Sequence, residues 1–212
     1  MTTLSEADSK ARLAPFGVPF PTEHLVETAD AAVATAAALG GPVALKLCGD
    51  NIAHKTERGL VRLDVAEVDV RDAAAALLAA ARPEDASTGV LVAPMVRGTR
   101  ELIAGANLDP QFGMTVMVGI GGILAEALGD VAIRLAPITR RDALDMLDDL
   151  SSQAMLGPFR GEPAVDREAV AGVLLALSAA ATDGDDVVSI DLNPLVIAQG
   201  RPVAVDALVE VR

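Results

Sequence analysis

Apolar residues recur along this chain with two different periods, and the two patterns follow one another in an irregular order. Residues 43–48 and 60–65 alternate in side-chain character as strands do, whereas the apolar residues of 167–181 repeat at helical spacing. Residues 99–119 and 187–211 each contain two strand patterns joined by a short, turn-rich connector. Frequent hairpins without a regular strand–helix–strand repeat favour an α+β fold over a doubly wound parallel sheet.

The composition limits both the core and the partners of the protein. The 212 residues include no Trp, no Tyr and four Phe, so the core must be built from Ala, Val, Leu and Ile. The formal net charge of −13 argues against general binding of nucleic acids or anionic membranes, because both require a basic surface. Nucleotides are not excluded, since a few local cations and backbone amides suffice for a phosphate.

Three further features indicate the compartment. The longest apolar run, residues 112–125, contains four glycines and is shorter than the roughly 20 residues of a membrane-spanning helix. The polar, acidic N-terminus is not typical of a secretory signal. The single Cys48 excludes an internal disulfide and a multi-cysteine zinc site. We therefore expect a soluble, cytoplasmic protein.

The segment ALKLCGDNIAHKTERGLV, residues 44–61, combines an unusually placed lysine with a rare histidine. Lys46 lies within an apolar strand and must reach water, an acidic partner or a bound anion, because burying an unpaired ammonium group is costly. His54 follows in a polar loop beside Lys55; such a loop can close over a phosphate, and histidine can accept a phosphoryl group. A snorkelling lysine and an ordinary surface histidine are the alternatives, and for an isolated loop histidine the second is the more common case.

The segment SIDLNPL near the C-terminus predicts a set of oxygen ligands. In a strand, Ser189, Asp191 and Asn193 point to one side, while the apolar residues between them point to the core. After the QGRP turn, the facing strand carries Asp206. Carboxylate and amide oxygens brought together by a hairpin suit Mg²⁺. Turn chemistry at the Asn-Pro step is the alternative for Asn193, but it does not explain an aspartate within an apolar strand.

Two further charged residues, Glu101 and Arg134, lie within otherwise apolar strands. A surface role fits either residue at least as well as a role in a site. The apolar stripe of the helix near Val170 indicates only a core-facing side.

Together these segments resemble the ATP-grasp subunit of the nucleoside-diphosphate-forming acyl-CoA synthetases, the family of the ADP-forming acetyl-CoA synthetases, which is related to the β subunit of succinyl-CoA synthetase. The resemblance runs from about residue 9 to residue 208 and rests on five segments in the same order: FGVPFPTEHLV, GGPVALKLCGDNIAHKTERGLV, GVLVAPMVRGTRELIAGANLDPQFG, VGIGGILAEALGDVAIRLAPIT and SIDLNPLVI followed by VAVDAL. It implies a single ATP-grasp domain over residues 1–212, with a lobe at about 20–95 that carries the phosphate-covering loop and a lobe at 96–212 that carries the Mg²⁺ site. The nucleotide would lie between the two lobes.

The resemblance also implies roles for individual residues. Six positions match residues that contact the nucleotide: Lys46 at the phosphates, Ala53 and Lys55 in the loop that covers them, Met95 and Val96 beside adenine, and Glu101 as an acidic contact. Asn193 and Asp206 match Mg²⁺ ligands. His54 matches a histidine that becomes phosphorylated, and Asp191 matches the acidic residue that steadies the phosphohistidine.

The reaction of the family converts ATP, a carboxylate and CoA to acyl-CoA, ADP and phosphate, and the phosphoryl group passes through histidine to an acyl phosphate. Lysine and Mg²⁺ neutralise charge on the transferring group. The family also requires a CoA-binding Rossmann-like domain with a second phosphohistidine, usually in an α subunit. The sequence shows no such domain, and the other histidine, His24, lies in no catalytic motif. We therefore expect one subunit of a hetero-oligomer that works with a separate CoA-binding partner.

Three residues depart from the pattern of the family: Ser189 where Glu is usual, Ala93 where Gln or Glu is usual, and Leu60 in place of a second glycine. The lysine, histidine and metal positions are kept, which favours an active subunit and leaves the nucleotide preference open. Two other functions fit the sequence. One is a different ATP-grasp ligase in which His54 is incidental, and the other is a nucleotide-binding regulatory subunit that transfers no phosphate.

Overall fold

A computed structural model describes residues 1–52, 55–122 and 129–212 of the chain. The chain divides into two compact units. The larger unit comprises Met1–Thr2, Ser9–Phe20 and Val96–Arg212, and the smaller unit comprises Thr3–Asp8 and Pro21–Met95. Helices and largely antiparallel sheets occur in both units, which confirms the expected α+β fold.

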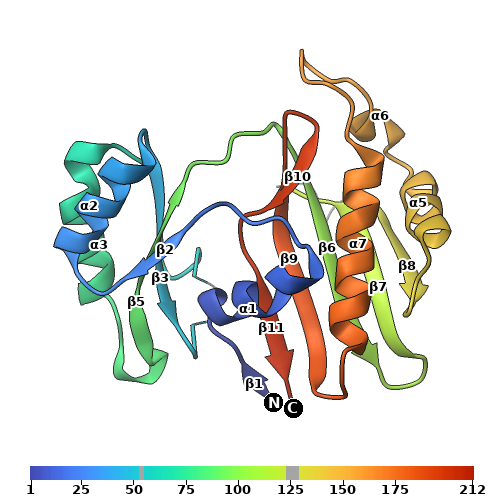
Figure 1. Cartoon of the computed structure of the whole chain (residues 1–212), viewed down its shortest axis with the longest axis horizontal. Helices are drawn as coiled ribbons and strands as arrows, with labels where there is room; N and C mark the ends of the chain where they lie inside the picture. The colour runs from blue at the N-terminus through green and yellow to red at the C-terminus, as the bar shows by residue number, and fades with distance from the viewer. Residues whose placement is uncertain (53–54, 123–128) are drawn as a thin grey trace. The chain divides into compact units, whose positions relative to one another are not determined.

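In the described residues, the smaller unit contains a four-stranded sheet with the order β2-β5-β3-β4. Its strands are β2 (His24–Val26), β3 (Val43–Gly49), β4 (Val61–Val65) and β5 (Ser87–Pro94). Helices α2 (Ala29–Leu39) and α3 (Val70–Ala79) pack on this sheet and share one buried apolar cluster with it (Figure 1). Strand β3 lies between β4 and β5, and all seven of its residues are buried. The strand that carries Lys46 is therefore the centre of this unit.

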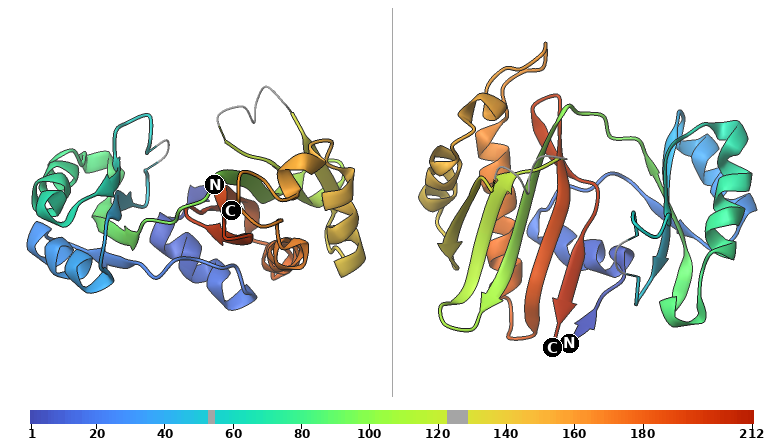
Figure 2. Two further views of the ribbon diagram at one scale, coloured as in Figure 1. Left: turned by 90° about the horizontal axis from the view of Figure 1, so that it is seen from above. Right: turned by 180° about the vertical axis from the view of Figure 1, so that it is seen from behind.

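The second sheet has seven strands in the described parts of the chain, with the order β1-β11-β9-β6-β7-β8 and with β10 beside β9. Its strands are β1 (Thr2–Thr3), β6 (Arg100–Asp109), β7 (Gly113–Ile120), β8 (Val131–Leu135), β9 (Val187–Ala198), β10 (Arg201–Ala204) and β11 (Leu208–Val211). Helices α5 (Arg140–Asp149) and α7 (Arg167–Thr182) cover one face, and the right panel of Figure 2 shows the sheet from the opposite side. The described residues also form helix α1 (Glu6–Leu13) and the short helix α6 (Gln153–Leu156).

Local sequence signals explain where several helices begin. The Thr28 hydroxyl accepts a hydrogen bond from the N–H of Ala31 and caps α2. Thr139 and Asp142 form a capping box at the start of α5, in which each side chain accepts from the other's backbone N–H. The Asp166 side chain caps α7 by accepting from the N–H of Ala169, and the apolar stripe of that helix is buried. Within the described ranges, no helix is both long and apolar enough to span a membrane.

Two elements differ from the sequence-based expectation. The final strand, expected over residues 203–211, is broken: β10 and β11 pair with different halves of β9. Asp206 consequently lies in the bend between two strands and not within a strand. In addition, no strand is predicted over His24–Val26 from the sequence; these three residues form β2 because they pair with β5.

Candidate active site

Lys46 occupies the middle of β3 with only 8% of its surface exposed. Its Nζ donates a hydrogen bond to Oε1 of Glu6 at 2.7 Å, and Glu6 is itself buried. The pair compensates two charges in a place where either charge alone would be costly. The structure therefore places Lys46 against an acidic partner and contradicts the interpretation of a snorkelling surface lysine.

Lys55 contacts the same carboxylate as Lys46. Its Nζ donates to Oε2 of Glu6, so the two oxygens of one carboxylate hold two ammonium groups. Sequence reasoning missed Glu6, because a glutamate in the first turn of a helix is common and its two partners lie 40 and 49 residues away. The predicted site residues Ala53 and His54, which precede Lys55, lie outside the described residues.

The connection between β3 and β4 is anchored on Asp85. The N–H of Asn51 donates to the backbone oxygen of Asp85 at 3.3 Å, and the guanidinium of Arg58 donates to both carboxylate oxygens at 2.7 and 2.8 Å. The hydrogen bonds from Arg58, and then the one from the backbone N–H of Arg82, lower the pKa of Asp85 to about 2 against the opposing effect of burial. Both ends of this connection are thus fixed to one buried residue, Asn51 through the backbone oxygen of Asp85 and Arg58 through its carboxylate.

In the larger unit, Asp191 and Asn193 lie on β9, and Asp206 lies in the bend after β10. Asp191 and Asn193 are exposed while Leu192 is buried, so the alternation of the strand directs both polar side chains to the same face. Desolvation of its carboxyl group raises the pKa of Asp191, and the negative charge of Asp206 raises it further. The hairpin therefore brings the two carboxylates close enough to interact.

The predicted metal ligands Asn193 and Asp206 carry an amide oxygen and a carboxylate, which are oxygen donors of the kind that Mg²⁺ prefers. A cation beside Asp206 would also offset the negative charge that raises the pKa of Asp191. In the parts of the chain that the structure describes, no group of three or more His, Cys, Asp and Glu residues could hold a metal ion. A metal here would thus depend on the amide of Asn193 and on oxygens from water or a phosphate.

The remaining predicted contacts lie just after β5 and in β6. Met95 and Val96 follow β5, and the boundary between the two units falls between them. Glu101 lies in β6 and is partly buried. Their contacts with adenine and nucleotide stay predictions. Arg134 forms an ion pair with Asp149, which agrees with the surface role considered for it.

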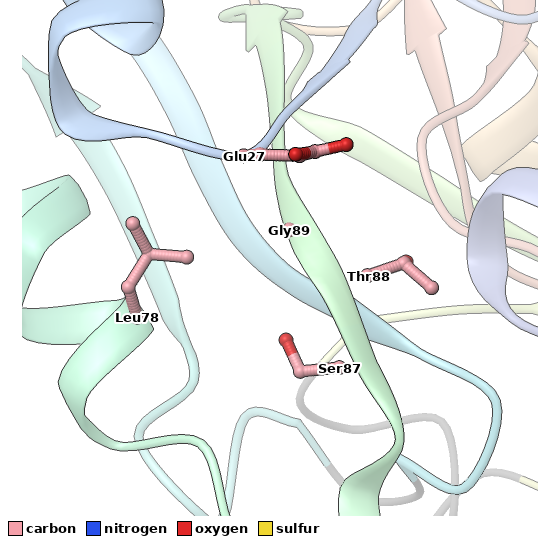
Figure 3. Close-up of a pocket in the computed structure, with 5 residues that line it drawn as sticks. All are labelled: Glu27, Leu78, Ser87, Thr88 and Gly89. Atoms are coloured by element: carbon pink, nitrogen blue, oxygen red, sulfur yellow. The ribbon is translucent and has the colours of Figure 1, made fainter.

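Figure 3 shows a pocket of about 440 Å³ in the smaller unit, lined by Glu27, Leu78, Ser87, Thr88 and Gly89. It contains none of the predicted site residues. Its polar side chains are one carboxylate and two hydroxyls, so this lining offers no positive charge to a phosphate. The candidate site does not lie in this pocket.

A family model described as an ATP-grasp domain matches residues 1–211, almost the whole chain. The chain belongs to the ATP-grasp domain family. This ATP-grasp chain is 37% identical over 205 residues to the β subunit of ADP-forming acetate–CoA ligase II from Pyrococcus furiosus, covering 92% of the chain and 85% of the relative. It is 34% identical over 208 residues to the β subunit of ligase I from the same organism, covering 96% and 90%. These matches confirm the resemblance to the ADP-forming acyl-CoA ligases.

Other ATP-grasp relatives are longer proteins. The chain is 37% identical over 194 residues to ADP-forming acetate–CoA ligase I of Archaeoglobus fulgidus, where it spans 90% of its own length but 28% of the relative. The same domain thus occurs both in separate β subunits and in longer ligases.

Solved structures share the ATP-grasp fold of this chain. A dinucleotide-forming acetyl-coenzyme A synthetase of Ca. Korarchaeum cryptofilum matches with a TM-score of 0.93 at 30% identity, over 100% of this chain and 94% of that chain. A protein of Pyrococcus horikoshii matches with a TM-score of 0.92 at 36% identity, over 100% and 92%. The fold that the sequence resemblance implied is therefore confirmed.

The structure describes the surroundings of Leu60, Ala93 and Ser189, the three residues that the sequence resemblance marks as departures from the family pattern. Leu60 is buried in the apolar cluster of the smaller unit, so its side chain contributes to the core. Ala93 is buried in β5 opposite Ala44 of β3. The Ser189 hydroxyl donates a hydrogen bond to Glu210 at 2.7 Å. None of the three is one of the lysines that contact Glu6 or one of the predicted metal ligands.

Proposed function

We propose that the chain is the ATP-binding, phosphoryl-transferring subunit of an ADP-forming acyl-CoA synthetase. The reaction takes ATP, a carboxylic acid and CoA, and it forms acyl-CoA, ADP and phosphate. The observation that carries the proposal is the likeness to two Pyrococcus furiosus β subunits over 85% and 90% of their lengths. The buried Lys46 and the partly buried Lys55 in the smaller unit, with the proposed oxygen ligands in the larger unit, would supply the chemistry that such a subunit needs.

The proposed ligands are ATP or ADP with Mg²⁺. A further Ca. Korarchaeum cryptofilum structure, similar to this chain at a TM-score of 0.83 and 31% identity, is described in complex with coenzyme A and Mg-AMPPCP. We assign Lys46 and Lys55 to phosphate oxygens, whose negative charge they would neutralise. Asn193 and Asp206 would hold Mg²⁺, which withdraws charge from the transferring group when bound. The other nucleotide contacts would be Ala53, Met95, Val96 and Glu101.

His54 is the proposed acceptor of the phosphoryl group. A ring nitrogen forms a bond to the γ-phosphorus as the bond to the β–γ bridging oxygen breaks, and ADP leaves with the electron pair. We assign Asp191 to support of the phosphohistidine, because a carboxylate can fix the orientation of an imidazole and stabilise its charged form. His54 then passes the phosphoryl group on, and the resulting acyl phosphate is attacked by CoA.

The proposed partner is a separate CoA-binding subunit with its own phosphohistidine, in a hetero-oligomer. The name "subunit beta" of both Pyrococcus furiosus relatives supports a partner chain. Relatives of similar identity are named for acetate, 4-hydroxybutyrate and trans-ferulate. Because such different acids occur with a similar ATP-grasp domain, we place the choice of acid in the partner.

Exchange of labelled ADP into ATP tests the proposal without that partner. A phosphohistidine that forms reversibly from ATP can phosphorylate labelled ADP, so the purified chain with Mg²⁺, ATP and labelled ADP should produce labelled ATP. The variant His54→Ala should lose this exchange, and the control His24→Ala should keep it. Exchange that persists in His54→Ala would refute the role of His54. No exchange, with or without the CoA-binding subunit, would refute phosphoryl transfer and favour a regulatory subunit.

A further inference from the structure

Glu6 is a fully enclosed carboxylate to which no role has been assigned so far. Its side chain is 1% exposed, and those of Lys46 and Lys55 are 10% and 11% exposed. One carboxylate oxygen accepts from Lys46 at 2.7 Å and the other accepts from Lys55. Because the two oxygens belong to one carboxylate, the two ammonium groups must lie close together.

Two ammonium groups that bind the same carboxylate repel each other strongly when they are shielded from water. A carboxylate between them offsets this repulsion, and the three groups together carry a formal charge of +1. Each ammonium group has three N–H donors, so a hydrogen bond to Glu6 is compatible with a further bond to a phosphate oxygen. The arrangement suits the binding of an anion by two cations that are held in place beforehand.

Helix α1 fixes Glu6 in this position. The Ser5 hydroxyl accepts from the N–H of Asp8 at 3.1 Å and donates to its carboxylate at 2.6 Å, which closes the first turn around Glu6. Residues Thr3–Asp8 also group with the smaller unit, which contains both lysines. The capped turn fixes the backbone of Glu6, and the burial of its side chain restricts the positions that the carboxylate can take.

We propose that Glu6 is a positioning residue that holds Lys46 and Lys55 side by side so that they bind the phosphates of the nucleotide together. This inference rests on the proposed function, because that function assigns both lysines to phosphate. It adds a residue from a distant part of the sequence to the phosphate site. It also predicts that Glu6 acts on phosphate binding and not on recognition of the nucleoside.

The test is the affinity of the full chain for Mg·AMPPCP, Mg·ADP and adenosine, measured by titration calorimetry. In Glu6→Gln the amide oxygen can accept from one lysine, but the amide N–H₂ faces the other. We expect the affinity for Mg·AMPPCP and Mg·ADP to fall about tenfold or more, with little change for adenosine. The control Asp72→Asn removes the same charge from an exposed residue in the first turn of α3, on a different helix of the same unit; its phosphate affinity should match the parent.

Each outcome decides the question. If Glu6→Gln lost affinity for adenosine and for Mg·AMPPCP equally, Glu6 would have a general structural role, and the inference would be overturned. Unchanged or tighter binding of Mg·AMPPCP by Glu6→Gln would also overturn it and leave the proposed function intact. A parent chain that binds neither nucleotide would overturn the proposed function together with the inference. If Glu6→Gln does not fold, Glu6→Asp replaces it in the test, because it keeps the charge on a side chain one methylene shorter. We expect Glu6→Asp to lose less affinity, and only for the phosphate-bearing ligands.

Discussion

At the scale of single residues, burial determines what the two lysines can do. An ammonium group inside a protein needs a partner, and Glu6 supplies one for both Lys46 and Lys55. Lys46 could be singled out from the sequence, because a lysine within an apolar strand is conspicuous locally. Glu6 could not, because only the fold brings residue 6 to residues 46 and 55.

Lys46→Met tests the assignment of Lys46 to phosphate. Methionine replaces most of the side-chain volume without the charge, and Glu6 keeps Lys55 as a partner, so we expect a folded protein. Loss of one charge-stabilising group should lower the rate of ADP–ATP exchange by about 100-fold. Arg71→Met is the control, since Arg71 forms an exposed ion pair with Asp30 on the helices of the same unit. An exchange rate within twofold of the parent in Lys46→Met would contradict the assignment.

We expect Asp85 to make a contribution to the free energy of unfolding that depends on pH. Its pKa falls from 3.8 to about 2 on folding, mainly through Arg58. The lowered pKa means that ionised Asp85 stabilises the folded state at pH values above its pKa in the unfolded chain. This stabilisation disappears as the pH falls from about 4 toward 2. Asp85→Asn should therefore have a lower free energy of unfolding than the parent at pH 6, and the difference should shrink below pH 4. Urea unfolding across this range checks the prediction, and a difference that does not vary with pH would refute it.

At the scale of elements, local signals account for most helices and hairpins. Caps at Thr28, Thr139 and Asp166 lie where the structure begins its helices. The break between β10 and β11 could not be predicted, because both halves of residues 203–211 have strand character. What separates them is pairing with different parts of β9, and this pairing leaves Asp206 in the bend. The proximity of Asp206 to Asp191 thus depends on a non-local contact.

The capping box of α5 gives a prediction for one element. In Thr139→Ala the N–H of Asp142 loses its acceptor, so the free energy of unfolding should fall by about 1 kcal/mol. Thr35→Ala is a matched change inside α2, where alanine has the higher helix propensity, and it should not destabilise the protein through lost capping. Chemical denaturation of the three proteins checks this. A loss in Thr139→Ala no larger than that in Thr35→Ala would show that the cap contributes nothing.

At the scale of the whole molecule, five sequence segments in order were enough to predict the ATP-grasp family and its fold. Which residues belong to each of the two units could not be fully predicted from these segments. Residues Thr3–Asp8 group with Pro21–Met95, whereas Ser9–Phe20 group with the larger unit. The expected lobe began at about residue 20, because nothing in the first residues indicates that Glu6 contacts β3. The roles of His54, the oxygen ligands and the nucleotide contacts stay proposals that experiments on the whole chain can test.

The most direct of these experiments follows the γ-phosphoryl group of ATP. The full chain is incubated with Mg²⁺ and γ-labelled ATP, alone and with its CoA-binding partner, and protein-bound label is tested for the acid lability and base stability of phosphohistidine. Our account predicts such label on His54, its loss in His54→Ala, and its transfer onward when the partner, CoA and a carboxylic acid are added. Label that persists in His54→Ala, or a chain that takes up no label even with the partner present, would contradict it.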